Sequence, residues 1–186
     1  DADDGKEKFT FAPNEMMKNQ KAAFLSETSS TGGTASLFYG IDAPWTAFTQ
    51  YVSKSNGTLT VKGSERNTDG STYNSSNTNL ELKGLQWVYG GLRMGGRSYY
   101  ALDLSDLDKP SLKFHINPDA AMTTNATTGA IEVNTSNALS YMGQSWSKPT
   151  IAYVKFGGVK KLVMFVGGGY DPGYENAAYD QSTTTG

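Results

Sequence analysis

A glycine-rich stretch between two short apolar runs constrains this chain most. The first run is Trp87–Tyr89 and the second is Ser98–Leu104, both dominated by aromatic, β-branched or other apolar residues. Such residues favour a pleated, half-buried surface, and two runs joined by a glycine-containing connection indicate a β-hairpin. The connection holds more glycine than a turn needs, which predicts close packing of backbone against backbone. These glycines are Gly90, Gly91, Gly95 and Gly96.

The same pattern returns later in the chain. Trp87–Asp103 aligns without a gap with Met164–Asp180, and its glycine pair falls on Gly167 and Gly168. Repeats of short strands with periodic glycine and aromatic residues are typical of β-propeller blades, which usually span about 40–50 residues. The longer spacing here predicts insertions within the repeat. We interpret the two glycine segments as equivalent inner strands of neighbouring blades.

The chain is therefore predicted to be all-β, a fragment of one β-propeller domain spanning residues 1–186. It would contain one whole four-stranded blade and parts of two neighbours, with loop insertions and one short helix. The sequence opens with Asp1–Gly5, a composition typical of a turn, which also suggests a piece of a longer protein. The expected divisions are the end of a blade and a short helix (1–25), a whole blade (37–116) with an insertion (53–83), a second insertion (117–148), and the start of the next blade (149–180).

Several elements are expected within these divisions. An outer strand is predicted at Glu7–Ala12, followed by a helix from about Glu15 to Phe24 with Asn14 as its cap. A brief strand is expected at Leu37–Tyr39, and a small external hairpin from Leu59–Val61 and Leu80–Leu82. The strands of the whole blade are predicted at Trp45–Val52, Gln86–Tyr89, Ser98–Leu104 and Leu112–Ile116. The next blade is predicted to begin with Ile151–Phe156, a turn at Gly157 and Gly158, and Lys161–Val166.

Composition excludes several classes of function. The net charge of −2 gives no large basic face for nucleic acid. The chain has no cysteine, so it has no disulfide framework and no thiol chemistry. No apolar run approaches the roughly 20 residues of a membrane span.

Few residues are candidates for chemistry. Asp1 and Asp3 are weak candidates for a calcium loop, but Gly5 comes one place too early and Ala12 stands where a glutamate is needed, so a solvated turn is favoured. His115 is the one histidine, and an outward or satisfied side chain is the favoured interpretation. No catalytic or cofactor-binding residue is predicted.

Arginines and aromatic residues leave two alternatives open. Arg93 and Arg97 flank the glycine-rich connection and could each pair with a carboxylate or bind an anion; structural pairing is favoured. The prominent aromatic residues could bind sugar, but packing in a core is the default on strands. They are Trp45, Trp87, Trp146, Tyr99, Tyr100 and Tyr170.

Several stretches together resemble the PilY1/PilC family of type IV pilus biogenesis factors and tip-associated adhesins of Gram-negative bacteria. The most specific are Gly90–Asp103 and Gly167–Asp171 followed by Tyr174 and Glu175. The likeness also covers Gly5–Met16, Tyr39–Trp45, Ser140–Pro149 and Phe165–Asn176, and is interrupted by the Ser/Asn/Thr-rich insertions.

The resemblance implies the C-terminal domain of that family, a modified quinoprotein-like β-propeller without enzymatic activity. It implies a role in pilus assembly, pilus extension and surface adhesion, at a pilus tip or outer membrane after export. The implied partners are minor pilins, the remainder of the propeller, and a host or surface receptor. The family's calcium loop of alternating aspartates is not present, so no cofactor is expected in this segment, with calcium possible elsewhere in the parent protein. A quinone-dependent dehydrogenase-like propeller and a sugar-binding propeller are the alternatives.

Overall fold

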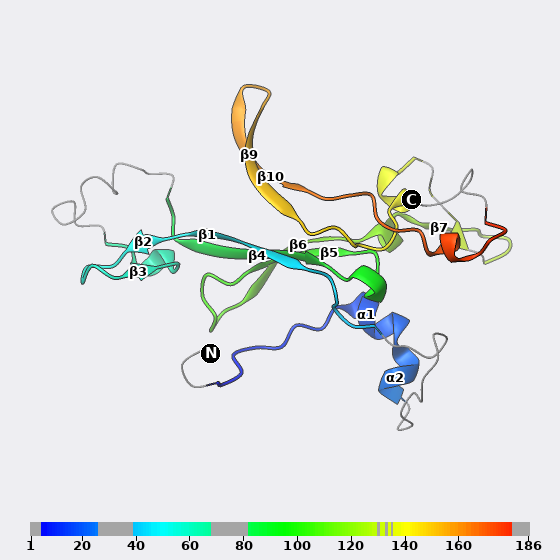
Figure 1. The fold of residues 1–186 in the computed structure, drawn as a ribbon, viewed down its shortest axis with the longest axis horizontal. Helices are drawn as coiled ribbons and strands as arrows, with labels where there is room; N and C mark the ends of the chain where they lie inside the picture. The colour runs from blue at the N-terminus through cyan, green and yellow to red at the C-terminus, as the bar shows by residue number, and fades with distance from the viewer. Residues whose placement is uncertain are drawn as a thin grey trace. The chain divides into compact units, whose positions relative to one another are not determined.

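The computed structural model describes residues 5–25, 39–67, 82–129, 131–132, 134 and 136–179. These residues form mainly β-structure with short helical segments (Figure 1). The prediction of an all-β chain is confirmed at that level. Among the described residues no sheet closes on itself.

The principal sheet has four strands in the order β1-β4-β5-β6 (Figure 1). β4 and β5 are the two runs that flank the glycine-rich connection, and β6 follows Pro110, so the predicted strands of the whole blade are present with small shifts at their ends. Their bounds are β1 Trp45–Gln50, β4 Leu85–Gly91, β5 Tyr99–Asp103 and β6 Ser111–Ile116.

The first predicted strand ends early. β1 stops at Gln50, and β2 (Val52–Ser53) instead pairs antiparallel with β3 (Leu59–Thr60). The predicted pairing of Leu59–Val61 with Leu80–Leu82 is therefore wrong for residues 59–60; residues 80 and 81 lie outside the described part of the chain. A local turn decides this pairing, because Gly57 adopts φ 87° and the Asn56 side chain accepts hydrogen bonds from Thr58.

The N-terminal segment differs from the prediction in two ways. Glu7–Ala12 is not a strand, since it joins no ladder, and its two phenylalanines line a pocket instead. The predicted helix is split into α1 (Asn14–Asn19) and α2 (Lys21–Leu25). Pro13 occupies the N-cap with no side-chain cap bond, so Asn14 is the first helical residue and not the cap. Of the predicted strand at residues 37–39, residues 37 and 38 lie outside the described part, and Tyr39 is not in a strand.

The chain divides into two compact units. The first comprises residues 1–11, 46–89 and 100–114. Its core is aromatic: Phe11 packs edge-on against Tyr100, with ring centroids 5.2 Å apart, and Phe48 packs against Trp87 at 6.2 Å. The buried apolar residues of this unit are Val52, Leu85, Tyr89, Tyr100, Ala101 and Leu102.

The second unit comprises residues 12–45, 90–99 and 115–186. Its largest fully buried side chains are Tyr99, Leu92, three prolines and three serines. Small polar residues therefore fill space at its centre, where backbone segments lie close together. The described residues of the chain include 3₁₀ turns at Gly63–Glu65, Arg93–Gly95, Pro118–Ala121, Ala138–Tyr141 and Pro172–Glu175.

The second unit carries two hairpins. β7 (Thr123–Thr124) pairs with β8 (Ile131–Glu132) inside the predicted insertion. β9 (Thr150–Phe156) pairs antiparallel with β10 (Val159–Phe165) through the predicted turn at Gly157 and Gly158, both of which have positive φ.

The predicted repeat is matched only at its start, where residues 87–88 lie in β4 and the aligned residues 164–165 lie in β10. Tyr99–Asp103 forms β5, whereas the aligned residues 176–179 form a turn. Tyr89 is buried inside β4, whereas Val166 is half-buried and follows the end of β10. The two copies differ because the backbone groups of Gly168 and Tyr170, which follow β10, form hydrogen bonds with Gly143 and Gln144.

Candidate functional site

One buried carboxylate holds the glycine-rich connection that follows β4. Glu15 of α1 is 8% exposed. Its Oε1 accepts a hydrogen bond from the Arg97 backbone N–H at 2.7 Å, and its Oε2 accepts one from the Ser98 N–H at 3.1 Å. Hydrogen bonds to an ionised acceptor are stronger than neutral ones, so this side chain fixes the start of β5 relative to α1.

A second contact comes from residues 143–147, which we call the junction segment. The Ser145 Oγ accepts a hydrogen bond from the Leu92 N–H at 2.7 Å, and the Ser145 N–H donates to the Gly96 carbonyl at 3.0 Å. A Cβ on Gly91 would lie 2.5 Å from the Ser145 carbonyl oxygen. This close approach explains why glycine stands at position 91.

The junction segment also contacts the later glycine run. The Gly143 N–H donates to the Gly168 carbonyl at 2.9 Å, and Gln144 forms an antiparallel bridge with Tyr170. The Gly167 N–H donates to the Ser147 Oγ at 2.8 Å. Both glycine segments that the sequence aligned therefore pack against the same five residues, each through a serine hydroxyl.

The two arginines pair structurally, as predicted. Arg97 donates to the carbonyls of Met142 at 2.7 Å and Ser140 at 2.9 Å, and to Asp119 at 3.0 Å. Arg93 lies 3.5 Å from Asp42. Its guanidinium also stacks on a tryptophan ring, at 4.4 Å from the centroid.

A polar cavity of about 350 Å³ lies beside Arg97. Its charged lining consists of Arg97 and the carboxylates Glu15, Asp119 and Asp171. Asp171 is 5% exposed and accepts hydrogen bonds from the Gly173 N–H and the Tyr179 hydroxyl. Within the described part of the chain, no group of three His, Cys, Asp or Glu residues is arranged to hold a metal ion. These charged groups already form hydrogen bonds with one another or with backbone groups.

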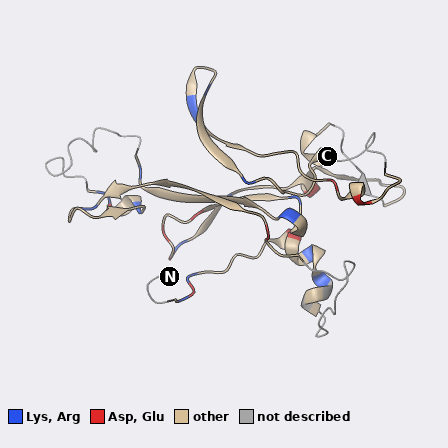
Figure 2. Ribbon diagram, in the orientation of Figure 1, with Lys and Arg blue, Asp and Glu red and all other residues tan. Residues whose placement is uncertain are grey.

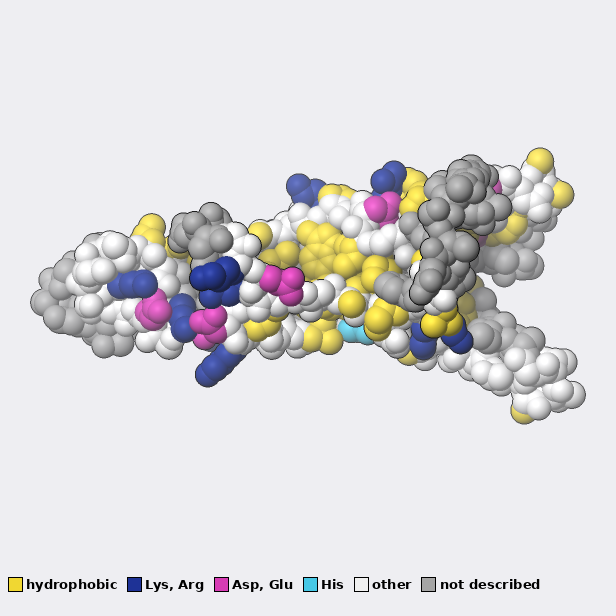
Figure 3. Space-filling view, turned by 90° about the horizontal axis from the view of Figure 1, so that it is seen from below, with side chains coloured by type: hydrophobic (Ala, Val, Ile, Leu, Met, Phe, Trp, Pro, Cys, Tyr) yellow, Lys and Arg dark blue, Asp and Glu magenta, His cyan; other side chains and the backbone are white. Residues whose placement is uncertain are grey.

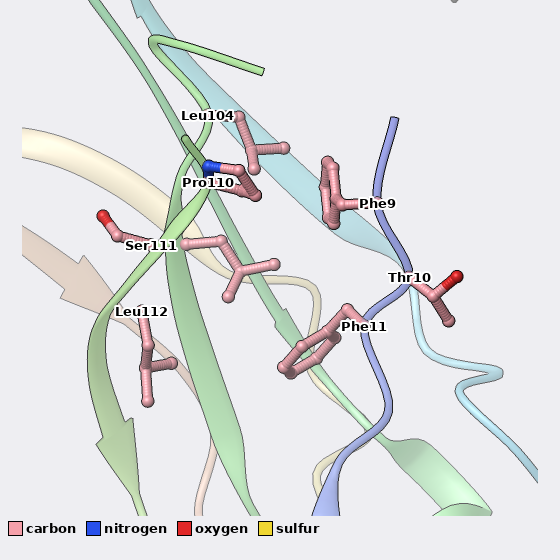
Figure 4. Close-up of a pocket in the computed structure, with 8 residues that line it drawn as sticks. Phe9, Thr10, Phe11, Leu104, Pro110, Ser111 and Leu112 are labelled. Carbon is pink, nitrogen blue, oxygen red and sulfur yellow. The ribbon is translucent and has the colours of Figure 1, made fainter. Parts of the chain in front are cut away.

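An apolar pocket of about 170 Å³ lies in the first unit (Figure 4). Phe9 and Phe11 face Leu104 and Pro110 across it, while Thr10 points away from the space between them. Figure 3 shows hydrophobic side chains gathered on one face of the molecule. The pocket suits an aliphatic or aromatic side chain.

The aromatic residues divide between core and surface. Tyr99 and Tyr100 are buried, at 0% and 4% exposure, so packing in a core is confirmed for them. Trp146 is 36% exposed and packs against Tyr170, with ring centroids 5.1 Å apart. Tyr170 is half-buried, and the sequence did not distinguish these two residues from the buried aromatics.

The remaining candidates are placed as follows. His115 lies on β6 with an exposed side chain, as expected; partial burial lowers the pKa of its imidazole, against the opposing charge of Glu15. Asp1 and Asp3 lie outside the described residues.

Glu15 and Ser145 were missed by sequence reasoning. A carboxylate among apolar helical residues (Met16, Met17) was the available signal for Glu15, and nothing distinguished Ser145 from the many other serines.

Comparisons with known proteins leave the site to be interpreted on its own geometry. No protein-family model, curated protein or solved structure matches this chain. Among the described residues, every helix is too short or too polar to cross a bilayer.

Proposed function

We propose that this chain is part of a type IV pilus tip-associated protein that supports pilus assembly, pilus extension and surface adhesion without catalysis. In this proposal it is a portion of a quinoprotein-like β-propeller that acts by binding other proteins, minor pilins among them. It is exported and works at the cell surface, at the pilus tip or outer membrane.

The observation that carries the proposal is the junction segment. The glycine run Gly90–Gly96 and the run Gly167–Gly169 are the parts of the sequence that resemble the pilus-tip family most specifically. Both contact residues 143–147, through Ser145 and Ser147. Contact of both runs with the same five residues supports placing the two runs in one packed fold.

The charged groups of the second unit favour a structural role over a chemical one. Glu15 accepts two hydrogen bonds from backbone N–H groups, and Arg97 donates two to backbone carbonyls. A rigid, hydrogen-bonded scaffold with an apolar pocket and exposed aromatic residues is typical of a binding module.

Co-purification tests the proposal. The tagged chain, mixed with minor pilins of its source organism, is expected to retain at least one of them. The variant Gly91→Ala, which disturbs the junction segment, is expected to retain less, while Gly40→Ala serves as the control. Retention of no minor pilin at micromolar concentrations would remove the assembly role.

A sugar-binding propeller is the second candidate, favoured by Trp146, which is 36% exposed and packs against the half-buried Tyr170. An exposed aromatic face is suited to the apolar face of a sugar ring. Under this alternative, glycan-array binding would be lost in Trp146→Ala and kept in Phe156→Ala, another exposed aromatic substitution. Absence of glycan binding by the unmodified chain would exclude it.

A further inference from the structure

The hairpin β9–β10 forms a two-stranded sheet. Its register pairs Val159 with Phe156 at the turn and Phe165 with Thr150 at the open end. Among the described residues, neither β9 nor β10 pairs with a third strand. A two-stranded hairpin is marginal by itself in water, and its outer edges present backbone groups that can pair with another strand.

Both faces of the hairpin carry apolar side chains. One face carries Ile151 with Met164 and Tyr153 with Leu162, which are direct cross-strand neighbours. The other face carries Ala152 with Val163 and Phe156 with Val159 by the same register. Four of the large residues are substantially exposed: Tyr153 at 47%, Phe156 at 68%, Val159 at 59% and Phe165 at 53%. This pattern is typical of strands inside a larger sheet.

The charges of the hairpin are all positive. Thr150–Phe165 contains Lys155, Lys160 and Lys161 and no acidic residue (Figure 2). Lys155 and Lys160 are direct cross-strand neighbours, and like charges in that position are destabilising. Lys161 extends on the opposite face, because successive residues of a strand alternate between faces. A strand added along β10 would therefore meet one lysine on each face, Lys160 lying over the Tyr153 ring at 4.5 Å and Lys161 over the Phe156 ring at 5.1 Å.

The chain itself does not supply this strand within the described residues. In the principal sheet, β5 begins soon after β4 ends and pairs with it. After β10, residues 166–179 do not return to its edge. Their backbone instead pairs with Gly143 and Gln144 and forms the turn at Pro172–Glu175.

We propose that the β10 edge is a docking site for an extended segment of a partner protein, with adjacent acidic residues flanked by apolar ones. The segment adds to the hairpin as a third strand, through backbone hydrogen bonds. Its two acidic residues pair with Lys160 and Lys161 on opposite faces, and its apolar residues cover the exposed side chains. A second copy of the hairpin would bring lysines against lysines, so charge disfavours it as the occupant.

This inference stands on the hairpin alone and does not require the pilus assignment. Within the proposed propeller, the partner segment would take the place of the third strand of an incomplete blade. Peptide binding without retention of minor pilins would leave the inference intact and remove the pilus role.

The experiment uses the whole chain and two ten-residue peptides of alternating valine and threonine. One peptide carries Glu-Glu at its centre and the other Lys-Lys. Fluorescence anisotropy is expected to show binding of the Glu-Glu peptide at least about tenfold tighter than binding of the Lys-Lys peptide. Hydrogen exchange is expected to show slower exchange of β10 amides in the complex, with β6 amides unchanged.

Variants test the role of charge. Lys161→Glu is expected to weaken binding of the Glu-Glu peptide about fivefold or more and to strengthen binding of the Lys-Lys peptide. Lys109→Glu makes the same change of net charge outside the hairpin and is expected to leave both affinities unchanged.

Three results would overturn the proposal. They are equal binding of the two peptides, protection of β6 in place of β10, and dimerisation of the chain through β10 in sedimentation velocity. Because the peptide comparison uses the unmodified chain, a variant that fails to fold does not prevent the test.

Discussion

At the scale of single residues, backbone groups are organised by a few side chains that are far away in sequence. Glu15 accepts hydrogen bonds from two successive amides at positions 97 and 98, and Ser145 contacts the opposite end of the same connection. The glycines around them leave room for these contacts and contribute no side-chain packing. The glycine-rich connection therefore depends on Glu15 and Ser145 for its conformation.

Glu15→Ala is expected to lower the free energy of unfolding by about 3 kcal/mol, because it leaves one buried and one partly buried N–H group without their acceptor. Glu15→Gln keeps one strong acceptor and is expected to cost about 1 kcal/mol. Urea denaturation of both variants measures the difference. Equal stability of Glu15→Ala and the unmodified chain would contradict this role.

Gly91→Ala is expected to cost about 2–3 kcal/mol, because its Cβ would lie 2.5 Å from the Ser145 carbonyl oxygen. Gly40→Ala is the matched control, since its Cβ would meet only the Met16 sulfur at 3.8 Å. Thermal unfolding followed by circular dichroism compares the two. A similar midpoint of thermal unfolding for both variants would show that the junction segment shifts to accommodate the added methyl group.

The Asp103 carboxylate is expected to make the free energy of unfolding depend on pH in the acid range. Its burial opposes ionisation, but hydrogen bonds from Ser105 and the Trp87 indole, with the charge of Lys113, lower the pKa of the carboxyl overall. A group with a lowered folded-state pKa stabilises the fold above its unfolded pKa of about 4, and this is lost as pH falls further. Urea denaturation between pH 5 and pH 2, as approximate limits, is expected to show a shallower decline for Asp103→Asn. Parallel curves would argue against this contribution.

At the scale of elements, local turn chemistry determined the hairpins more reliably than strand patterning did. The Gly157–Gly158 turn has φ values of 59° and 80°, which match a two-residue loop with both central residues in the left-handed region. The Asn56–Gly57 turn likewise brought β2 and β3 together. Glu7–Ala12, which has suitable residues but no hairpin turn, did not become a strand.

Gly157→Val is expected to destabilise the β9–β10 hairpin by about 1–2 kcal/mol, because a branched residue resists positive φ. Gly157→Asn is expected to cost less than about 0.5 kcal/mol, since asparagine tolerates this conformation. No atom lies within 4 Å of a Cβ at this position, so the difference reports backbone strain alone. Hydrogen exchange of β9 and β10 amides provides the measurement, and equal exchange in the two variants would contradict it.

At the scale of the whole molecule, charge is distributed unevenly. The chain has a net charge of −2, yet the β9–β10 hairpin holds three lysines and no acid. Local charge decides which segment approaches this edge, because fields of exposed charges fade within about 10 Å at 0.1 M salt.

Raising salt from about 0.05 to 0.5 M is therefore expected to weaken binding of the Glu-Glu peptide about tenfold. The free energy of unfolding is expected to change by less than about 0.5 kcal/mol, because the ion pairs of the described residues lie at least partly exposed. Anisotropy titrations and urea denaturation at both salt concentrations test the two parts. Salt-independent peptide binding would remove the electrostatic explanation.

By itself, the sequence determined the strands at Leu85–Gly91, Tyr99–Asp103 and Ser111–Ile116 and the turn at Gly157–Gly158, because residue type and turn chemistry act over a few neighbouring residues. The tertiary structure decided the rest. The carboxylate of Glu15 meets amides at positions 97 and 98, and Ser145 meets Leu92, only after the chain has folded. It also decided that Gly168 and Tyr170 make their backbone hydrogen bonds with the junction segment, so that no described residue after β10 pairs with that strand.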